Sequence, residues 1–179
     1  MPLYFNGKNI PSSGVVNFNS QSKNRVVRNG AEVWKKEVTL WPGNTFQFRT
    51  DAKGMDDYPP QAYASGNTLI LKCNGYGHEA ACSLGGINFA PYSKLTFTMN
   101  GSARYAQLWF GVFSAWTNLS GANQVKATKF DGDPVNVNGS YTVDISGVTG
   151  TYNAQVFLRT GGGAYDLKGQ INITKITLS

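Results

Sequence analysis

Residues 94–100 read Lys-Leu-Thr-Phe-Thr-Met-Asn, a strict alternation of polar and apolar side chains. Successive side chains of a β-strand point to opposite faces of a sheet, so this pattern predicts a strand with one face in a core and the other in solvent. Residues 141–145, Tyr-Thr-Val-Asp-Ile, repeat the alternation. Both segments therefore indicate β-structure that is buried on one side.

The same kind of pattern, interrupted by Gly, Asn, Asp and Pro, continues from Val38 to the C-terminus. It predicts nine strands, at residues 37–41, 45–49, 68–73, 94–100, 105–115, 124–130, 140–146, 152–160 and 170–178. In the last strand the apolar parity changes between Ile173 and Ile176, which predicts a β-bulge near Thr174-Lys175. Nine strands without a helical period favour an all-β fold, a jelly-roll β-sandwich preceded by a short β-hairpin arm.

The composition agrees with this fold class. Gly, Asn, Ser and Thr supply 65 of the 179 residues, which disfavours long helices, while 41% hydrophobic and 13% aromatic residues provide enough apolar surface for a core. Residues 1–8 lack the basic stretch and apolar run of a secretory signal, and no segment reaches the roughly 18 apolar residues of a membrane helix. We expect synthesis in a cytoplasm and no membrane partner.

The two cysteines and the single histidine are too few for a structural zinc site, which needs four such ligands. Cys73 and Cys82 flank a Gly-rich segment that is expected to be a loop, and a disulfide across it is sterically possible. Two free buried thiols are the alternative, because disulfides are rare in a cytoplasm. The sequence leaves both open.

Positive charge is concentrated at the N-terminus. The first 36 residues hold six basic residues against Glu32 alone, so they carry +5 of the net charge of +6. No module with aromatic or helical readers accompanies these charges, so no nucleic-acid partner is expected. An attachment surface is the preferred interpretation, and its expected residues are Arg25, Arg28, Trp34, Lys35 and Lys36.

Asn29-Gly30 supplies the two residues of a type I′ turn between β-prone runs and predicts a hairpin over residues 25–36. Strands this short are marginally stable alone and need another surface to lie against. We therefore expect residues 1–37 to form a basic attachment segment and residues 38–179 to form the sandwich domain.

The opening "YFNGKNI" followed by "NRVVRNGAEVWKKE" resembles the N-terminal segments of minor structural proteins, associated with tails or fibres, of tailed phages and prophages of Gram-positive bacteria. The resemblance covers about 36 residues. It implies a virion component made in the host cytoplasm, other virion proteins as partners, and a homo-oligomer in the particle.

The succession "NTLILKC", "YSKLTFTMNGSA", "AQLWFGVFSAW", "GSYTVDISGVTGTYNAQVFLRT" and "GQINITKITL" resembles galactose-binding-like jelly rolls, the architecture of many carbohydrate-binding modules. This resemblance covers roughly residues 38–179 and implies a glycan partner, although fold alone does not fix function.

Two strands share an outward face that suits a sugar. Ala106, Leu108, Phe110 and Val112 on one strand, and Ala154, Val156 and Leu158 on another, occupy core parity. The opposite parity holds the expected ligand-binding residues, Tyr105, Gln107, Trp109, Gln155, Phe157 and Arg159. Aromatic rings cover the C–H faces of sugars, and planar polar groups bind paired hydroxyls.

The alternative is that this face is buried under the N-terminal segment, the loop expected at residues 58–63, or another subunit. Further contact points could be Trp41, Tyr76, Trp116 and Tyr165, although the preferred interpretation of each is an ordinary packing residue.

Enzymatic chemistry is not expected. His78 lies in a Gly-rich segment without a nucleophile at motif spacing, and the aspartates at 51, 56, 57, 131 and 133 are interpreted as turn residues. Asp131-Gly132-Asp133 is a possible calcium ligand, and no other cofactor is expected.

The primary hypothesis is a non-enzymatic virion component of a tailed phage, anchored by its N-terminal arm and displaying a jelly roll for adhesion to host-surface carbohydrate. The alternatives are a carbohydrate-binding module of a bacterial protein unrelated to virions, a capsid-decorating protein without glycan binding, and a glycan hydrolase.

Overall fold

The computed structural model describes residues 37–52, 59–115, 123–161 and 169–179, together with the backbone of six short strands nearer the N-terminus. All of the regular elements in this part of the chain are strands, which confirms the all-β prediction. The described residues form no helix, and therefore no helix that is long and apolar enough to cross a membrane.

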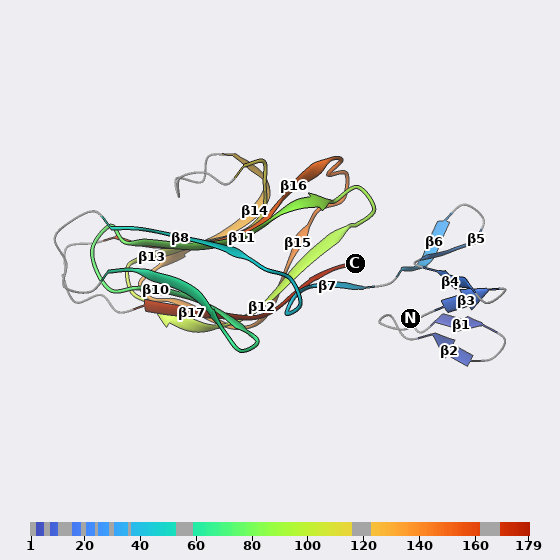
Figure 1. Ribbon diagram of the computed structural model, residues 1–179, viewed down its shortest axis with the longest axis horizontal. Coiled ribbons are helices and arrows are strands. Elements are labelled where there is room, and N and C mark those ends of the chain that lie inside the picture. The colour runs from blue at the N-terminus through green and yellow to red at the C-terminus, as the bar shows by residue number, and fades with distance from the viewer. Residues whose placement is uncertain are drawn as a thin grey trace.

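Two antiparallel sheets pack face to face (Figure 1). The first sheet has the order β15-β12-β17-β10-β9, and β7 also pairs with β17; the second has the order β14-β13-β16-β11-β8. The bounds are β7 (Val38–Trp41), β8 (Gln47–Asp51), β9 (Gln61–Ser65), β10 (Thr68–Cys73), β11 (Glu79–Asn88), β12 (Lys94–Ala103), β13 (Ala106–Phe113), β14 (Gln124–Gly132), β15 (Val135–Asp144), β16 (Thr151–Thr160) and β17 (Gly169–Leu178). Apart from the β9–β10 and β13–β14 pairs, successive strands lie in opposite sheets, as in a jelly roll.

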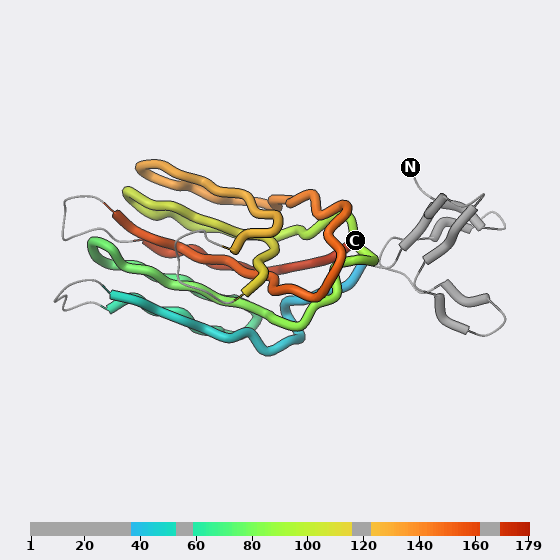
Figure 2. Tube along the Cα trace, turned by 90° about the horizontal axis from the view of Figure 1, so that it is seen from above, coloured from blue at the N-terminus to red at the C-terminus, as the bar shows by residue number. Residues whose placement is uncertain are grey.

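One end of the sandwich collects several connections. The β10–β11, β12–β13 and β14–β15 connections lie together there, and the C-terminus lies toward the opposite end (Figure 2). The last residues of β16 reach the same end, because Arg159 pairs with Glu79 of β11 and with Gln107 of β13. The loops at this end frame the functional site described below.

Six further strands precede the sandwich. They form three separate two-stranded sheets, β1 (Leu3–Phe5) with β2 (Lys8–Ile10), β3 (Val16–Phe18) with β4 (Gln21–Lys23), and β5 (Arg25–Arg28) with β6 (Ala31–Lys35). The antiparallel pairing of β5 with β6 matches the predicted hairpin strands, whereas Asn29 and Gly30 lie outside the described residues. The side chains of the expected attachment residues, Arg25, Arg28, Trp34, Lys35 and Lys36, also lie outside them. Their role and the boundary at residue 37 remain predictions.

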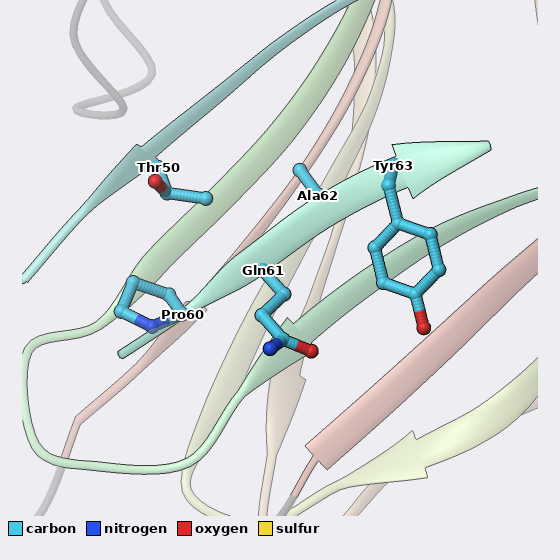
Figure 3. Close-up of a pocket in the computed structure, with 5 residues that line it drawn as sticks. All are labelled: Thr50, Pro60, Gln61, Ala62 and Tyr63. Atoms are coloured by element: carbon cyan, nitrogen blue, oxygen red, sulfur yellow. The ribbon is translucent and has the colours of Figure 1, made fainter. Parts of the chain in front are cut away.

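Two strands were not predicted. Residues 61–63, expected to be part of a loop, begin β9, which pairs with β10; Thr50 of β8 lies across from them (Figure 3). Residues 79–83 begin β11, although residues 79–81 were expected to belong to the Gly-rich loop. These five residues are all buried, because β11 is an interior strand with covered side chains on both faces, so the sequence shows no alternation there.

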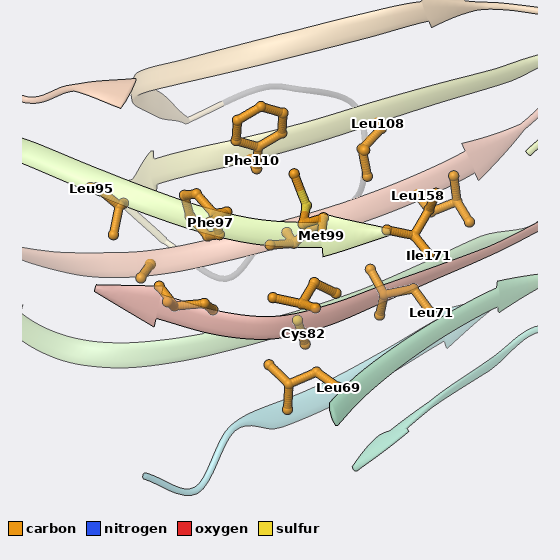
Figure 4. Packing of buried hydrophobic residues seen from close by; sticks show 14 of the residues in the cluster. Leu69, Leu71, Cys82, Leu95, Phe97, Met99, Leu108, Phe110, Leu158 and Ile171 are labelled. Carbon is orange, nitrogen blue, oxygen red and sulfur yellow. The ribbon is translucent and has the colours of Figure 1, made fainter. Parts of the chain in front are cut away.

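The core lies between the sheets, where Phe97, Leu108, Phe110 and Leu158 interlock (Figure 4). The rings of Phe97 and Phe110 meet edge to face with centroids 5.4 Å apart. Burial alternates along β12 as the sequence predicts.

The predicted bulge is confirmed in β17. Thr98 pairs with Lys175 and Met99 pairs with Ile173, so Thr174 is the extra residue. Because the bulge shifts the parity by one residue, Ile173 and Ile176 both reach the core.

Cys73 and Cys82 are free and buried, so the free-thiol alternative is confirmed. Burial raises the pKa of both thiols, that of Cys82 to about 12. At neutral pH both are protonated apolar groups of the core.

Deletion of residues 1–36 is expected to leave a folded sandwich. The two sheets are built from β7–β17, and the buried core of the described residues runs from Leu40 to Leu178. The truncated protein should therefore keep its far-ultraviolet circular dichroism and its thermal midpoint. Loss of a cooperative unfolding transition would mean instead that the N-terminal strands complete the core.

Candidate functional site

The outer face of the second sheet carries three rows of side chains in register. The row at the end of the sandwich reads Asp131, Gln107, Arg159, Glu79 and Asp51 across the five strands. The next row reads Lys129, Trp109, Phe157, Ala81 and Arg49. The third reads Ala127, Gly111, Gln155, Ser83 and Gln47. Polar and charged groups thus line the end of the sheet, and aromatic and small residues follow.

The structure brings the predicted ligand-binding residues together. Gln107 pairs with Arg159, and Trp109 pairs with Phe157, on adjacent strands β13 and β16. The prediction that Trp109 and Arg159 share one face is therefore confirmed. Their availability differs, however, because Phe157 is 1% and Gln155 2% exposed. These two residues form the floor of the face, and their direct contact with a ligand stays a prediction.

Trp109 is also less available than expected. Its ring stacks on Phe157 with centroids 5.8 Å apart and an angle of 16° between the planes, and Lys129 Nζ lies 5.3 Å from its centroid. Phe113 meets the edge of Phe157 and completes a small apolar cluster with Ala81. Trp109 is therefore a packing residue of this face.

Replacing Trp109 by alanine is expected to lower the free energy of unfolding by about 2 kcal/mol, because the half-buried indole covers Phe157. Chemical denaturation measures this loss, with Tyr63→Ala as the control, since Tyr63 is an exposed aromatic residue of the first sheet. If Trp109→Ala kept the wild-type stability, the ring would be free to act as a ligand platform after all.

Tyr105 is the exposed aromatic residue of the site, with 44% of its surface accessible. It lies in the β12–β13 turn in a left-handed conformation, φ 44°. Its backbone N–H donates to Asp133 Oδ1 at 3.2 Å, its carbonyl accepts from the Gly161 N–H at 2.7 Å, and the Arg104 guanidinium lies 5.2 Å from its ring centroid. A bulky residue disfavours the left-handed conformation and keeps it only where surrounding contacts hold the backbone. Such residues are concentrated at functional sites.

A cleft of about 280 Å³ opens beside this ring and is lined by Tyr105, Gln107, Asp131, Arg159 and Gly161. We call it the end cleft. Gln107 Nε2 donates to Asp131 Oδ2 at 3.1 Å, and Lys129 Nζ donates to the same oxygen at 2.6 Å. Three of its residues, Tyr105, Gln107 and Arg159, were predicted from parity, whereas Asp131 and Gly161 were not.

Ion pairs fix the charged groups of the cleft. Arg159 Nε lies 3.4 Å from Glu79 Oε1, and the Glu79 side chain is only 8% exposed. Arginine has five N–H donors, so this pair orients the guanidinium while its Nη nitrogens keep donors for a ligand. No sequence pattern pointed to Glu79, because it lies in the segment expected to be a loop.

Asp133 holds the turn that presents Tyr105. It accepts hydrogen bonds from Arg104 Nε and Nη2 and from the Tyr105 backbone N–H. The hydrogen bond from Arg104 is the main cause that lowers the pKa of Asp133 below its usual range. The paired carboxylate is thus stabilised in the folded state.

The sign of this shift predicts a pH dependence. A carboxylate with a lowered folded-state pKa stabilises the protein above its unfolded pKa, about 3.9, and this contribution is lost as pH falls through the folded-state pKa. Between about pH 6 and pH 2, the thermal midpoint should fall more in the wild type than in Asp133→Asn. Parallel curves for the two proteins would show that the ion pair contributes nothing to stability.

The four further contact points suggested by the sequence differ in their exposure and in whether the structure describes them. Trp41 is buried, donates from Nε1 to the Asn67 carbonyl at 3.0 Å and packs on Phe46, so it is an anchor of the fold. Tyr76 is exposed. Trp116 and Tyr165 lie outside the described residues, as do Asp56 and Asp57.

Asp131 and Asp51 lie in strands β14 and β8, which corrects their interpretation as turn residues, whereas Asp133 does lie in a turn. Among the described residues there is no group of three or more His, Cys, Asp or Glu side chains placed to hold a metal ion. Asp131 and Asp133 bond to cationic side chains instead. Calcium stays a prediction.

A second, more open groove of about 540 Å³ lies along β8 and β9 (Figure 3). It is lined by Thr50, Pro60, Gln61, Ala62 and Tyr63. None of these five described lining residues is charged, and Figure 3 shows the Tyr63 ring directed away from Thr50. The end cleft, by contrast, combines an aromatic ring with amide, guanidinium and carboxylate groups.

Comparisons with known proteins were made at the level of sequence and of structure. No protein-family model and no curated protein sequence matches this chain. Among solved structures, it is similar to the xylan-binding module CBM86 from Roseburia intestinalis, with 13% identity, a TM-score of 0.44, and coverage of 76% of this chain and 96% of that chain. It is also similar to the family 11 carbohydrate-binding module from Clostridium thermocellum, in complex with a β-1,3-1,4-mixed-linked tetrasaccharide, with 12% identity, a TM-score of 0.46, and coverage of 79% and 94%. A third similar structure is the Endo-D glycoside hydrolase domain from Streptococcus pneumoniae R6, with 16% identity, a TM-score of 0.42, and coverage of 87% and 25%.

The structural neighbours thus include carbohydrate-binding modules with a β-sandwich fold, and nothing in the names of these neighbours indicates a phage origin. Identities and TM-scores this low carry no statement about the ligand or the site of this chain.

Proposed function

We propose that this chain is a non-catalytic carbohydrate-binding domain and that the end cleft holds a sugar against Tyr105. The supporting observation is the exposed Tyr105 ring, fixed at its backbone, beside the planar side chains of Gln107 and Arg159. An aromatic ring covers the apolar C–H face of a pyranose, while amide and guanidinium groups bind adjacent hydroxyls. A specific site for a small ligand requires a small number of polar groups at fixed positions beside an apolar surface.

The carboxylates of this face favour binding over hydrolysis. A glycosidase needs two carboxyl groups on either side of one glycosidic bond. Asp131 and Glu79 are separated by two intervening strands, which places their backbones about 14 Å apart. Asp51 is next to Glu79, but the Glu79 side chain is only 8% exposed and its carboxylate is paired with Arg159, so little of it is accessible to a glycosidic bond.

We favour a carbohydrate-binding module of a bacterial protein over a tailed-phage component. All residues that support the proposal belong to the sandwich, whereas the phage interpretation depends on residues 1–36, whose side chains lie outside the described residues. Adhesion to a host surface, other virion proteins as partners and a homo-oligomer remain predictions of that second interpretation. The end cleft favours glycan binding over capsid decoration in either case.

Affinity electrophoresis of the full chain tests the proposal. The gels contain xylan, mixed-linkage β-glucan, galactan or polysaccharide from Gram-positive cell walls. At least one polymer should retard the wild type, and Tyr105→Ala should weaken that binding roughly tenfold or more, which is about 1.4 kcal/mol. Arg159→Lys should also weaken it, because lysine lacks the planar fork.

Tyr63→Ala is the matched control, because it removes another exposed tyrosine outside the end cleft. It should migrate as the wild type does, and all variants should keep the wild-type thermal midpoint. If no polymer retarded the wild type, the proposed function would be wrong. If Tyr63→Ala alone released the polymer, binding would belong to the open groove along β8 and β9.

A further inference from the structure

Tyr76 is the most exposed of the large hydrophobic residues that the structure describes, with 54% of its surface accessible. It lies in the β10–β11 connection, but its backbone is held firmly. The carbonyl of Gly75 accepts from Thr160 Oγ1 at 2.6 Å, and the N–H of Gly77 donates to the Thr160 carbonyl at 2.9 Å. Both neighbours of Tyr76 are therefore fastened to one fully buried residue of β16.

The end of β16 holds both exposed tyrosines. Thr160 fixes the loop of Tyr76 on the β11 side, and Gly161 donates its N–H to the carbonyl of Tyr105 on the β13 side. Strands β11 and β13 are the two neighbours of β16, so their axes are about 10 Å apart. Gly161, which adds no side chain beyond its Cα, lines the end cleft between them.

We infer that Tyr76 is a second aromatic contact of the same site and that the ligand is an oligosaccharide that crosses the end of β16 from Tyr105 to Tyr76. This inference rests on the proposed function. The connections that carry the two rings are held on opposite sides of β16, so the rings contact different sugar units of one chain and the site discriminates by chain length. Because both backbones are already fixed, binding orders little of the protein.

Isothermal titration calorimetry of the full chain tests the inference. The titrants are the monosaccharide, disaccharide and tetrasaccharide of xylan and of mixed-linkage β-glucan. Tyr76→Ala should lower the affinity for a bound tetrasaccharide about tenfold and leave the affinity for the monosaccharide unchanged. Tyr63→Ala, the control with similar exposure, should change neither affinity.

Thr160→Val tests whether the anchoring matters. It removes the hydroxyl that bonds to Gly75 and nearly preserves the side-chain shape. It should weaken tetrasaccharide binding in the wild-type background and add no further loss to Tyr76→Ala. An equal loss in both backgrounds would show that Thr160 acts through the fold and not through Tyr76.

The two proposals fail in different ways. If Tyr105→Ala abolishes tetrasaccharide binding and Tyr76→Ala leaves it unchanged, the proposed function stands and the second contact is wrong. Equal losses for every chain length in Tyr76→Ala would likewise overturn the length dependence. If the wild type binds none of these saccharides, the inferred oligosaccharide is wrong, whereas the proposed function fails only if no polymer in the gels retards the wild type.

Discussion

The register of strand β16 between β13 and β11 is the constraint on which the site depends. Its inward side chains, such as Val156 and Leu158, are fully buried in the core. Its outward side chains pair with those of β13, so Arg159 lies beside Gln107 and Phe157 beside Trp109. A slip of one residue would exchange the two sets, exposing core residues at a cost of roughly 1.5–3 kcal/mol for each large apolar side chain. Core burial therefore fixes which groups line the end cleft.

The loops depend on the same strand. Beyond its last ladder pairs, Thr160 and Gly161 hydrogen-bond to the β10–β11 loop and to the β12–β13 turn. A third support comes from Asp133, which holds Arg104 and the backbone of Tyr105. These contacts place exposed aromatic rings on rigid connections, whereas surface loops are generally the more mobile parts of a fold. Rigid presentation is what a binding surface requires if little entropy is to be lost when a ligand arrives.

The aromatic row has a structural role that parity alone does not reveal. Trp109 covers Phe157 and is itself approached by Lys129, whose ammonium also bonds to Asp131 of the end cleft. Lys129 therefore contacts both the aromatic row, at the Trp109 ring, and the charged row, at Asp131. The division between a packed floor and a polar rim resembles the usual anatomy of binding surfaces.

Local alternation of polar and apolar residues predicted the strand faces, the bulge at Thr174 and the common face of Trp109 and Arg159, because its period of two residues is encoded in neighbouring positions. The same pattern could not predict β11, since an interior strand buried on both faces shows no alternation. The burial of Phe157 and the exposure of Tyr105 follow from the tertiary structure, because exposure depends on neighbouring strands that are far away in the chain. The loop that carries Tyr76 and the turn that carries Tyr105 are both held at the end of β16 by hydrogen bonds. A local sequence pattern could not predict these bonds, because they join segments that are far apart in the chain.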